Sequence, residues 1–91
     1  MNKTTFIKKA KELLNKRFDF EINQMSAKVI TFDAHKDFGD WTIEYLIIVS
    51  SCTMKRVYIS ELSNDRIYIK WEDMKAVQRE NNFKIVYDFE I

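Results

Sequence analysis

The stretch RVYISELSNDRIYIK, residues 56–70, decides the fold because it writes one five-residue pattern twice, on either side of a turn. RVYIS and RIYIK both place β-branched residues at every second position, as a half-buried strand requires. The residues ELSND between them are typical of a turn. The sequence therefore predicts an antiparallel hairpin centred on residue 63. Its predicted outer pairs are Tyr58 with Tyr68, Arg56 with Lys70 and Ser60 with Arg66, and its inner pairs are Val57 with Ile69 and Ile59 with Ile67.

The outer face of this hairpin is the candidate binding surface, because it combines two tyrosines with three cations. Tyrosine and arginine are favoured anchors in protein–protein contacts. Aromatic rings beside cations also suit the stacked bases and the phosphates of a single-stranded nucleic acid. A cross-strand tyrosine pair can equally serve to stabilise a solvent-facing sheet and fix its register. The predicted partner-binding residues are Arg56, Tyr58, Arg66, Tyr68 and Lys70.

The remaining segments supply one helix and several strands. Residues 3–16 predict an amphipathic helix, because their apolar side chains fall on one helical stripe. Asn2 or Thr4 is expected to cap that helix. From Phe18 to Ile22 apolar and polar residues alternate, which predicts a strand. Further strands are predicted at residues 27–33, 41–52 and 83–91, with a loop at 34–40 and a short helix at 72–81.

These elements predict an α+β fold in a single domain, residues 1–91. The N-terminal helix is expected to pack on a curved antiparallel sheet of about five to six strands, with a short second helix before the last strand. A chain of 91 residues, 46% of them hydrophobic, is large enough for one modest core. With one glycine and no proline, the sequence contains no flexible linker between domains.

Charge is unevenly spread along the chain, although the formal net charge is only +1. Residues 1–17 carry a basic excess and residues 18–51 an acidic one. A basic amphipathic helix can bind phosphates or an acidic partner, whereas the lack of an overall basic excess argues against a duplex-DNA binder. The alternative function is therefore a protein that binds single-stranded nucleic acid, RNA in particular, with this helix and the Tyr/Arg sheet face. The predicted nucleic-acid-binding residues are Lys8, Lys9, Lys11, Lys16 and Arg17.

One cluster in the sequence suggests chemistry. Asp33, His35 and Asp37 alternate, and two carboxylates with an imidazole can bind a transition metal. The spacing of the acidic residues from Asp33 also resembles that of an EF-hand calcium-binding loop. Such a loop needs glycine at the position of Phe38, so the segment does not match it. Cys52 and His35 could form a nucleophile–base pair, but nothing in their spacing requires it. We therefore expect no metal, no cofactor and no enzymatic activity.

Cysteine usage and hydropathy bear on the compartment. The chain has a single cysteine, which favours a reducing, cytoplasmic setting. The N-terminal segment lacks the apolar core of a signal peptide, and the longest apolar run, residues 45–49, is too short to cross a bilayer. We expect a cytoplasmic protein with no membrane partner.

The expected function is that of a small non-enzymatic protein-binding module. The abundance of Lys, Ile, Asn, Phe and Tyr is common in low-GC bacteria and their phages. This favours a phage or mobile-element accessory protein that inhibits a host defence enzyme by surface contact. The partner would be a host protein, a nuclease or another nucleic-acid enzyme, held by the hairpin face or, if it is basic, by the acidic residues 33–44. A homodimer formed through the terminal strand is a further alternative.

Overall fold

The computed structural model describes residues 1–50, 53–63, 66–75 and 84–90. Its α-helix is α1 (Lys3–Arg17), which is followed by a short π-helix, η1 (Phe20–Gln24). The strands are β1 (Lys28–Thr31), β2 (His35–Asp37), β3 (Asp40–Ser50), β4 (Thr53–Ser63), β5 (Arg66–Lys75) and β6 (Lys84–Glu90). The predicted α+β fold is confirmed.

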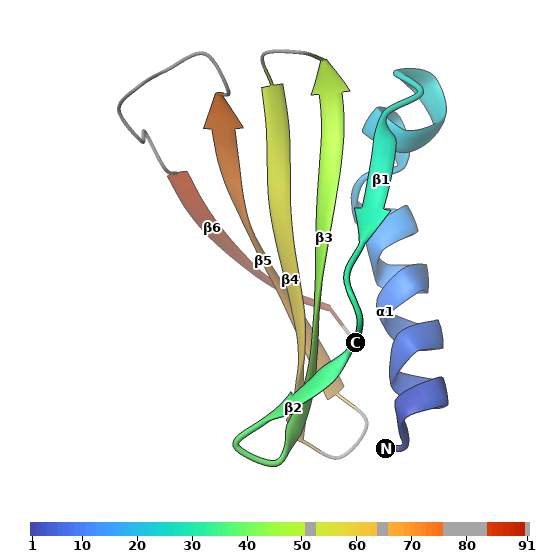
Figure 1. Ribbon diagram of the computed structural model, residues 1–91, viewed down its shortest axis with the longest axis vertical. Coiled ribbons are helices and arrows are strands. Elements are labelled where there is room, and N and C mark those ends of the chain that lie inside the picture. Colours follow the sequence, from blue (N-terminus) through green and yellow to red (C-terminus); the bar gives the residue numbers. More distant parts are fainter. Residues whose placement is uncertain (51–52, 64–65, 76–83, 91) are drawn as a thin grey trace.

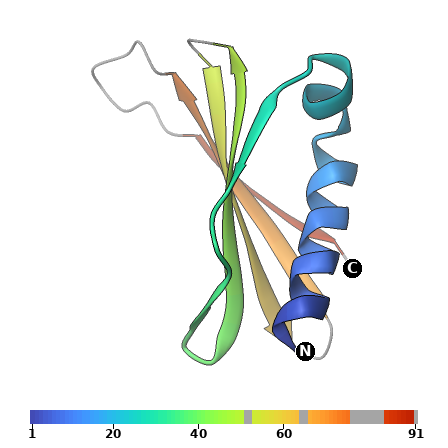
Figure 2. The ribbon, with the colours of Figure 1, turned by 45° about the vertical axis from the view of Figure 1, so that its right-hand side comes forward.

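The strands form one open antiparallel sheet with the order β1-β3-β4-β5-β6. The strand β2 pairs with the N-terminal end of β3, so β1 and β2 share one edge of that strand. Figure 1 shows the strands side by side, with α1 beyond β1. In Figure 2 the helix runs along one side of the sheet, and the turn between β2 and β3 lies at the lower end on the other side.

The helix α1 forms because its sequence supplies both a cap and a continuous apolar stripe. The side-chain Oδ1 of Asn2 accepts a hydrogen bond from the backbone N–H of Thr5 at 2.8 Å, which satisfies one of the free donors of the first turn. The expected Asn2 cap is therefore confirmed. Lys16 and Arg17 stand in the last turn, where the helix dipole favours positive charge. The buried residues of the helix are Phe6, Ala10, Leu13 and Leu14.

The strand predicted from Phe18 to Ile22 is wrong, because the chain continues from α1 into η1. Phe18 is only 3% exposed and meets the ring of Trp71 edge-on, with centroids 5.4 Å apart, whereas Phe20 is 63% exposed. Residues four apart share one side of a helical turn as well as one face of a strand. The backbone hydrogen bond from Ile22 N–H to the Phe18 carbonyl, 3.0 Å long, closes such a turn. The alternation therefore fits both a strand and a helical turn. Phe20 distinguishes them, because a strand would place it on the same face as the buried Phe18, whereas here it is exposed.

The predicted hairpin is present as β4 and β5, but its register is shifted by two residues. Tyr58 lies opposite Lys70, and Ser60 lies opposite Tyr68. The pairing nearest the turn joins Ser63 to Arg66, further along the chain than predicted, and a β-bulge between Glu61 and Ser63 then takes up one residue of β4. A shift of two residues keeps every side chain on its predicted face. The predicted pairs Tyr58 with Tyr68, Arg56 with Lys70, Ser60 with Arg66, Val57 with Ile69 and Ile59 with Ile67 are therefore wrong, while the division into inner and outer faces holds.

Two further sequence predictions need correction. The short helix predicted at 72–81 is not formed over its first residues, because β5 continues to Lys75 and pairs there with β4. Asp73 lies opposite Lys55 and their side chains form an ion pair, which favours the extended backbone over the helix. The rest of that predicted helix lies outside the described residues. The loop predicted at 34–40 contains the strand β2 and a two-residue turn.

The core lies between α1 and the inner face of the sheet. The edge-on ring pair of Phe18 and Trp71 closes one end of it, and the stacked rings of Phe6 and Trp41, 6.5 Å apart, close the other. Burying such apolar side chains supplies the main favourable free energy of folding. The buried sheet residues are Ile43, Tyr45, Ile47, Val57, Ile59, Ile67, Ile69 and Trp71.

Glu61 ties the start of α1 to the sheet. Its carboxylate accepts a hydrogen bond from the N-terminal ammonium of Met1 at 2.9 Å and a second one from the backbone N–H of Trp41 at 3.3 Å. The indole Nε1–H of Trp41 in turn donates to the Met1 carbonyl at 3.1 Å. The hydrogen bond from the ammonium, together with the one from Trp41, lowers the pKa of Glu61.

Among the described helices, none combines the length and apolarity that a bilayer-spanning segment needs.

Replacing Ile59 with alanine should remove a fully buried side chain and leave a cavity. We expect Ile59→Ala to lower the free energy of unfolding by about 2–5 kcal/mol. Ile48→Ala, on the half-buried outer face of β3, is the matched control and should cost clearly less. Urea unfolding followed by circular dichroism measures both. Equal losses for the two variants would contradict the assignment of inner and outer faces.

Replacing Glu61 with glutamine keeps its shape and removes its charge. At neutral pH, Glu61→Gln should cost about 1 kcal/mol, the difference between a hydrogen bond to a charged group and one to a neutral group. Because the folded-state pKa of Glu61 lies below its usual 4.5, its contribution is full above that pH and is lost as the pH falls through the folded-state pKa. Melting temperatures of both proteins should therefore converge in acid. A difference that is constant with pH would contradict this.

Candidate functional site

The outer face of the sheet, which points away from α1, is built from rows of facing side chains set by the register. One row is Thr42, Ser60 and Tyr68, the next is Glu44, Tyr58 and Lys70, and the next is Leu46, Arg56 and Glu72. The last row is Ile48, Met54 and Met74. The face thus changes along the strands from polar and aromatic at the β2 end to apolar at the other end. No described element covers it.

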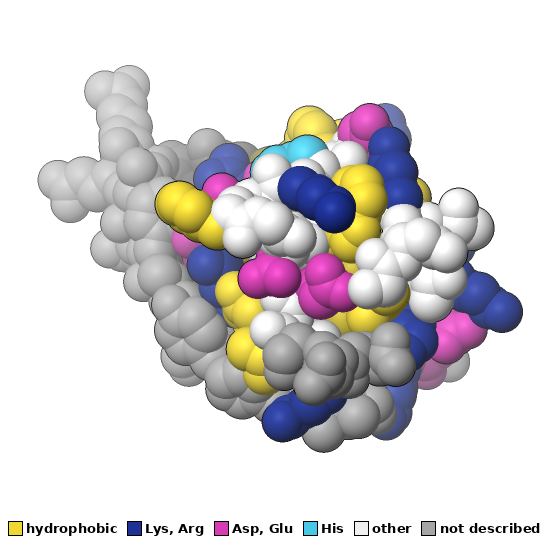
Figure 3. All heavy atoms as spheres, turned by 90° about the horizontal axis from the view of Figure 1, so that it is seen from below, with side chains coloured by type: hydrophobic (Ala, Val, Ile, Leu, Met, Phe, Trp, Pro, Cys, Tyr) yellow, Lys and Arg dark blue, Asp and Glu magenta, His cyan; other side chains and the backbone are white. Residues whose placement is uncertain are grey.

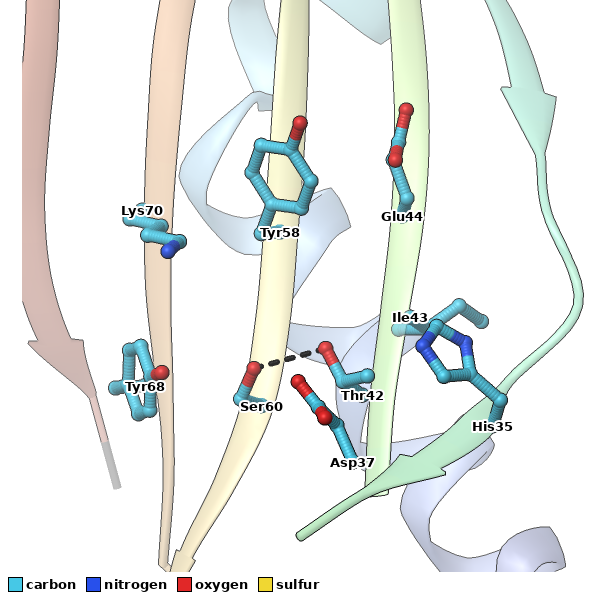
Figure 4. Close-up of a pocket in the computed structure, with 9 residues that line it drawn as sticks. All are labelled: His35, Asp37, Thr42, Ile43, Glu44, Tyr58, Ser60, Tyr68 and Lys70. Carbon is cyan, nitrogen blue, oxygen red and sulfur yellow. Dashed lines mark hydrogen bonds between the residues drawn. The ribbon is translucent and has the colours of Figure 1, made fainter. Parts of the chain in front are cut away.

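The polar rows form a groove of about 390 Å³. Figure 4 shows Tyr58 on β4, with Tyr68 and Lys70 on β5. His35 and Asp37 of β2 lie beside the first residues of β3, and α1 lies behind the sheet. The hydroxyls of Thr42 and Ser60 form a hydrogen bond, 2.9 Å long, across the floor. We refer to this site as the outer groove. Its lining residues are His35, Asp37, Thr42, Ile43, Glu44, Tyr58, Ser60, Tyr68 and Lys70.

The outer groove contains three of the five residues predicted from the hairpin: Tyr58, Tyr68 and Lys70. Arg56 lies one row further along, on the same face but outside the groove. Arg66 lies opposite Ser63, next to the β-bulge, and does not line the groove. Because the register is shifted by two residues, Tyr68 and not Arg66 lies opposite Ser60, so the predicted frame of three cations around the tyrosines is not formed.

Sequence reasoning missed that the acidic segment joins the same site. His35, Asp37 and Glu44 were assigned to a separate loop and strand, yet they line the outer groove beside the tyrosines. A signal was available in the sequence: Gly39, the only glycine, is the second central residue of a two-residue hairpin turn that Asp37 and Asp40 close. That hairpin folds β2 back onto β3 and brings His35 opposite Thr42.

The charges in and next to the outer groove alternate in sign. The Nζ atom of Lys70 lies 5.3 Å from the centroid of the Tyr58 ring, a cation–π contact. Nε of Arg56 is buried and lies 3.5 Å from Oε2 of Glu44, close enough to pair the charges but not to form a good hydrogen bond. A hydrogen bond with Tyr58 and the charge of Glu44 raise the pKa of Arg56. Figure 3, which views this end of the molecule, shows acidic, basic and hydrophobic side chains intermixed.

The apolar end of the outer face continues the same surface. Ile48, Met54 and Met74 are only half-buried although no described helix covers them. Ile30 of β1 lies opposite Leu46 and extends this apolar area to the edge of the sheet. Contiguous apolar side chains on an uncovered face mark sites of association.

The basic residues of α1 lie on the other side of the sheet. Arg17 places its guanidinium 4.7 Å from the centroid of the Trp71 ring, on the helix side. Lys8, Lys11 and Lys16 are exposed and Lys9 is half-buried on the same helix. The helix and the tyrosines therefore face opposite directions, and the two halves of the nucleic-acid site expected from the sequence do not form one surface.

The cluster of Asp33, His35 and Asp37 does not converge. Nζ of Lys3 pairs with Asp33 at 3.4 Å, which directs that carboxylate toward α1, while His35 and Asp37 line the outer groove. In the part of the chain that the structure describes, no three His, Cys, Asp or Glu side chains are grouped as metal ligands. Cys52 lies outside the described residues, so its pairing with His35 stays a sequence hypothesis.

Comparison with known proteins gives no family for this chain: no protein-family model, curated protein or solved structure shows a significant match to it. The geometry of the outer face is therefore the basis for any functional conclusion.

A double-mutant cycle tests the register that builds the outer groove. Combining Tyr58→Leu with Lys70→Met should reveal a coupling of about 0.5–1 kcal/mol, the usual strength of an exposed cation–π contact. The same cycle for Tyr58→Leu with Tyr68→Leu should give a smaller value, because these residues are diagonal neighbours. Urea unfolding of the single and double variants measures both. A larger coupling between the two tyrosines would contradict the register.

Proposed function

We propose that this protein is a non-enzymatic protein-binding module that uses the outer face of its sheet as the contact surface. The observation that carries the proposal is the composition of that face: an aromatic groove and an apolar area lie next to each other on one rigid sheet with no described element covering them. A core of apolar and aromatic side chains with a polar rim is the usual arrangement of a protein interface.

The charges favour a protein partner over a nucleic acid. Phosphates are bound by an excess of cations, whereas Asp37 and Glu44 oppose Lys70 and Arg56 at the outer groove. A face of mixed sign suits the side chains of another protein, which can match each charge in turn. The tyrosines add large, rigid contact area at low cost in side-chain entropy. The single-stranded nucleic-acid alternative is thus less well supported.

The exposure of the polar groups supports binding over catalysis. His35 and Asp37 are exposed on the rim of the outer groove. General acid–base chemistry gains most from groups held in a water-excluded site. An exposed imidazole on a short edge strand suits recognition of a partner, and the inhibition of a host enzyme expected from the sequence would follow from the same surface contact.

Removing the tyrosine rings should weaken partner binding with little change in folding. We expect Tyr58→Ala and Tyr68→Ala each to weaken the interaction about tenfold or more, as truncation of an interface anchor does. Phe20→Ala, which removes an equally large exposed ring from η1, is the control and should bind as the unmodified protein does. Affinity purification from the producing cells followed by surface plasmon resonance with the recovered protein measures these effects.

Two results would overturn the proposal. One is that no protein is recovered in stoichiometric amount. The other is that a labelled single-stranded oligonucleotide binds with an affinity that falls steeply with salt and depends on Tyr58 and Tyr68, which would favour the nucleic-acid alternative. Melting temperatures of all variants must accompany the binding data, since a loss of folding would mimic a loss of contact.

A further inference from the structure

The turn between β2 and β3 places a bulky aromatic residue where the backbone disfavours it. Phe38 has a φ of +52° and Gly39 a φ of +86°, and the flanking Asp37 and Asp40 form the closing pair of the hairpin. Positive φ at both central residues is the pattern of a type I′ turn, whose first central position is normally asparagine, aspartate or glycine. An aromatic residue at such a φ is an outlier.

No packing contact of the Phe38 side chain offsets this backbone strain. Its side chain is 100% exposed, more than that of any other large hydrophobic residue among those described. A side chain that touches no core residue contributes no burial to folding. By the requirements of the turn alone, asparagine would be the better residue at this position. Backbone strain that stabilises no contact within the fold points to a role in contacting another molecule.

The charges around the turn restrict what Phe38 can enter. Asp37 and Asp40 stand directly on either side of Phe38 and Gly39. Lys36 does not offset them fully, because its Nζ lies 5.2 Å from the centroid of the Trp41 ring on the helix side of the sheet. Two carboxylates beside an exposed aromatic ring oppose an anionic lipid surface, which attracts cations. They match an apolar pocket whose rim carries lysine or arginine.

The turn is continuous with the outer groove. A second hollow of about 200 Å³ is lined by Asp37, Phe38, Asp40 and Tyr68, among others. It shares Asp37, Thr42, Ser60 and Tyr68 with the outer groove. One partner can therefore contact the turn and the groove together.

From these observations we infer that Phe38 is an anchor residue, inserted by the β2–β3 turn into an apolar pocket with a basic rim on a partner protein. The inference rests on the proposed protein-binding function and names the chemistry of the partner. The sheet holds the turn in place through the β2–β3 pairing, so little conformational entropy is lost when the ring is inserted. Asp37 and Asp40 speed and orient the encounter with the basic rim.

The decisive variant is Phe38→Asn, because it separates binding from folding. Asparagine tolerates positive φ, so the melting temperature should stay equal or rise. Affinity for the partner should fall about tenfold or more, as expected for loss of an aromatic anchor. Phe38→Trp should retain binding, and Phe20→Asn, at another exposed ring, should leave it unchanged. Asp40→Asn should slow association and reduce its dependence on salt.

The partner itself is sought by photocrosslinking from position 38. The chain carrying p-benzoylphenylalanine there, and a control chain carrying it at position 20, are irradiated in lysate of the producing cells. The inference predicts a discrete crosslinked protein from position 38 only, blocked by excess unmodified protein and not by the Phe38→Asn variant. Vesicles of phosphatidylcholine, with and without phosphatidylglycerol, serve as the membrane arm and should not bind.

Four outcomes would overturn the inference. They are the absence of a discrete crosslinked protein, equal blocking by the Phe38→Asn variant, a crosslink only to a second copy of the chain, and vesicle binding that depends on Phe38. If Tyr58→Ala abolishes binding of a partner while Phe38→Asn does not, this inference fails and the proposed function stands. If no variant changes binding of any protein, both fail.

Discussion

The packing of the apolar stripe of α1 against one face of the sheet is the constraint on which the rest of the structure depends. Phe6, Ala10 and Leu14 are buried by the inner-facing side chains of β3, β4 and β5. One helix of this length covers one face of a sheet, and a 91-residue chain has enough apolar residues for one modest core. The opposite face is therefore left for other contacts, and its side chains are half-buried instead of buried.

The ends of the helix fix how it lies on the sheet. At its start, the Met1 ammonium and the Trp41 amide both donate to Glu61 on β4. At its end, Phe18 and Arg17 both contact Trp71 on β5: Phe18 packs edge-on against it and the Arg17 guanidinium lies over the ring. Because both attachments use the inner face, the basic side chains of α1 are held away from the tyrosines of the outer face. This geometry is why the segregated charge of the sequence does not become one binding surface.

The division of the sheet into two faces also explains where strain is tolerated. The core residues keep negative φ values, while the positive φ values found among the described residues belong to Gly39, Phe38 and Ser26, all outside the strands. Gly39 has open space around its missing Cβ, so the requirement for glycine there is its backbone conformation and not crowding. The strained aromatic residue beside it stands at the end of the outer groove, where the molecule meets its surroundings.

The sequence by itself determined the α+β class, the position of α1 with its cap narrowed to Asn2 or Thr4, and the two faces of the β4–β5 hairpin, because helical and strand periods are local properties of the chain. It did not determine the secondary structure of the segment from Phe18 to Ile22, since a spacing of four residues fits both a helix and a strand. The tertiary structure decided the register of β4 and β5, through the pairing of Ser63 with Arg66 next to the turn and a bulge beside it that no local pattern reveals. It also decided the composition of the outer groove, because His35 and Asp37 meet Tyr58 and Tyr68 only when β2 folds back on β3. Contacts between residues far apart in the chain depend on how the strands pair, and that pairing is a property of the whole sheet.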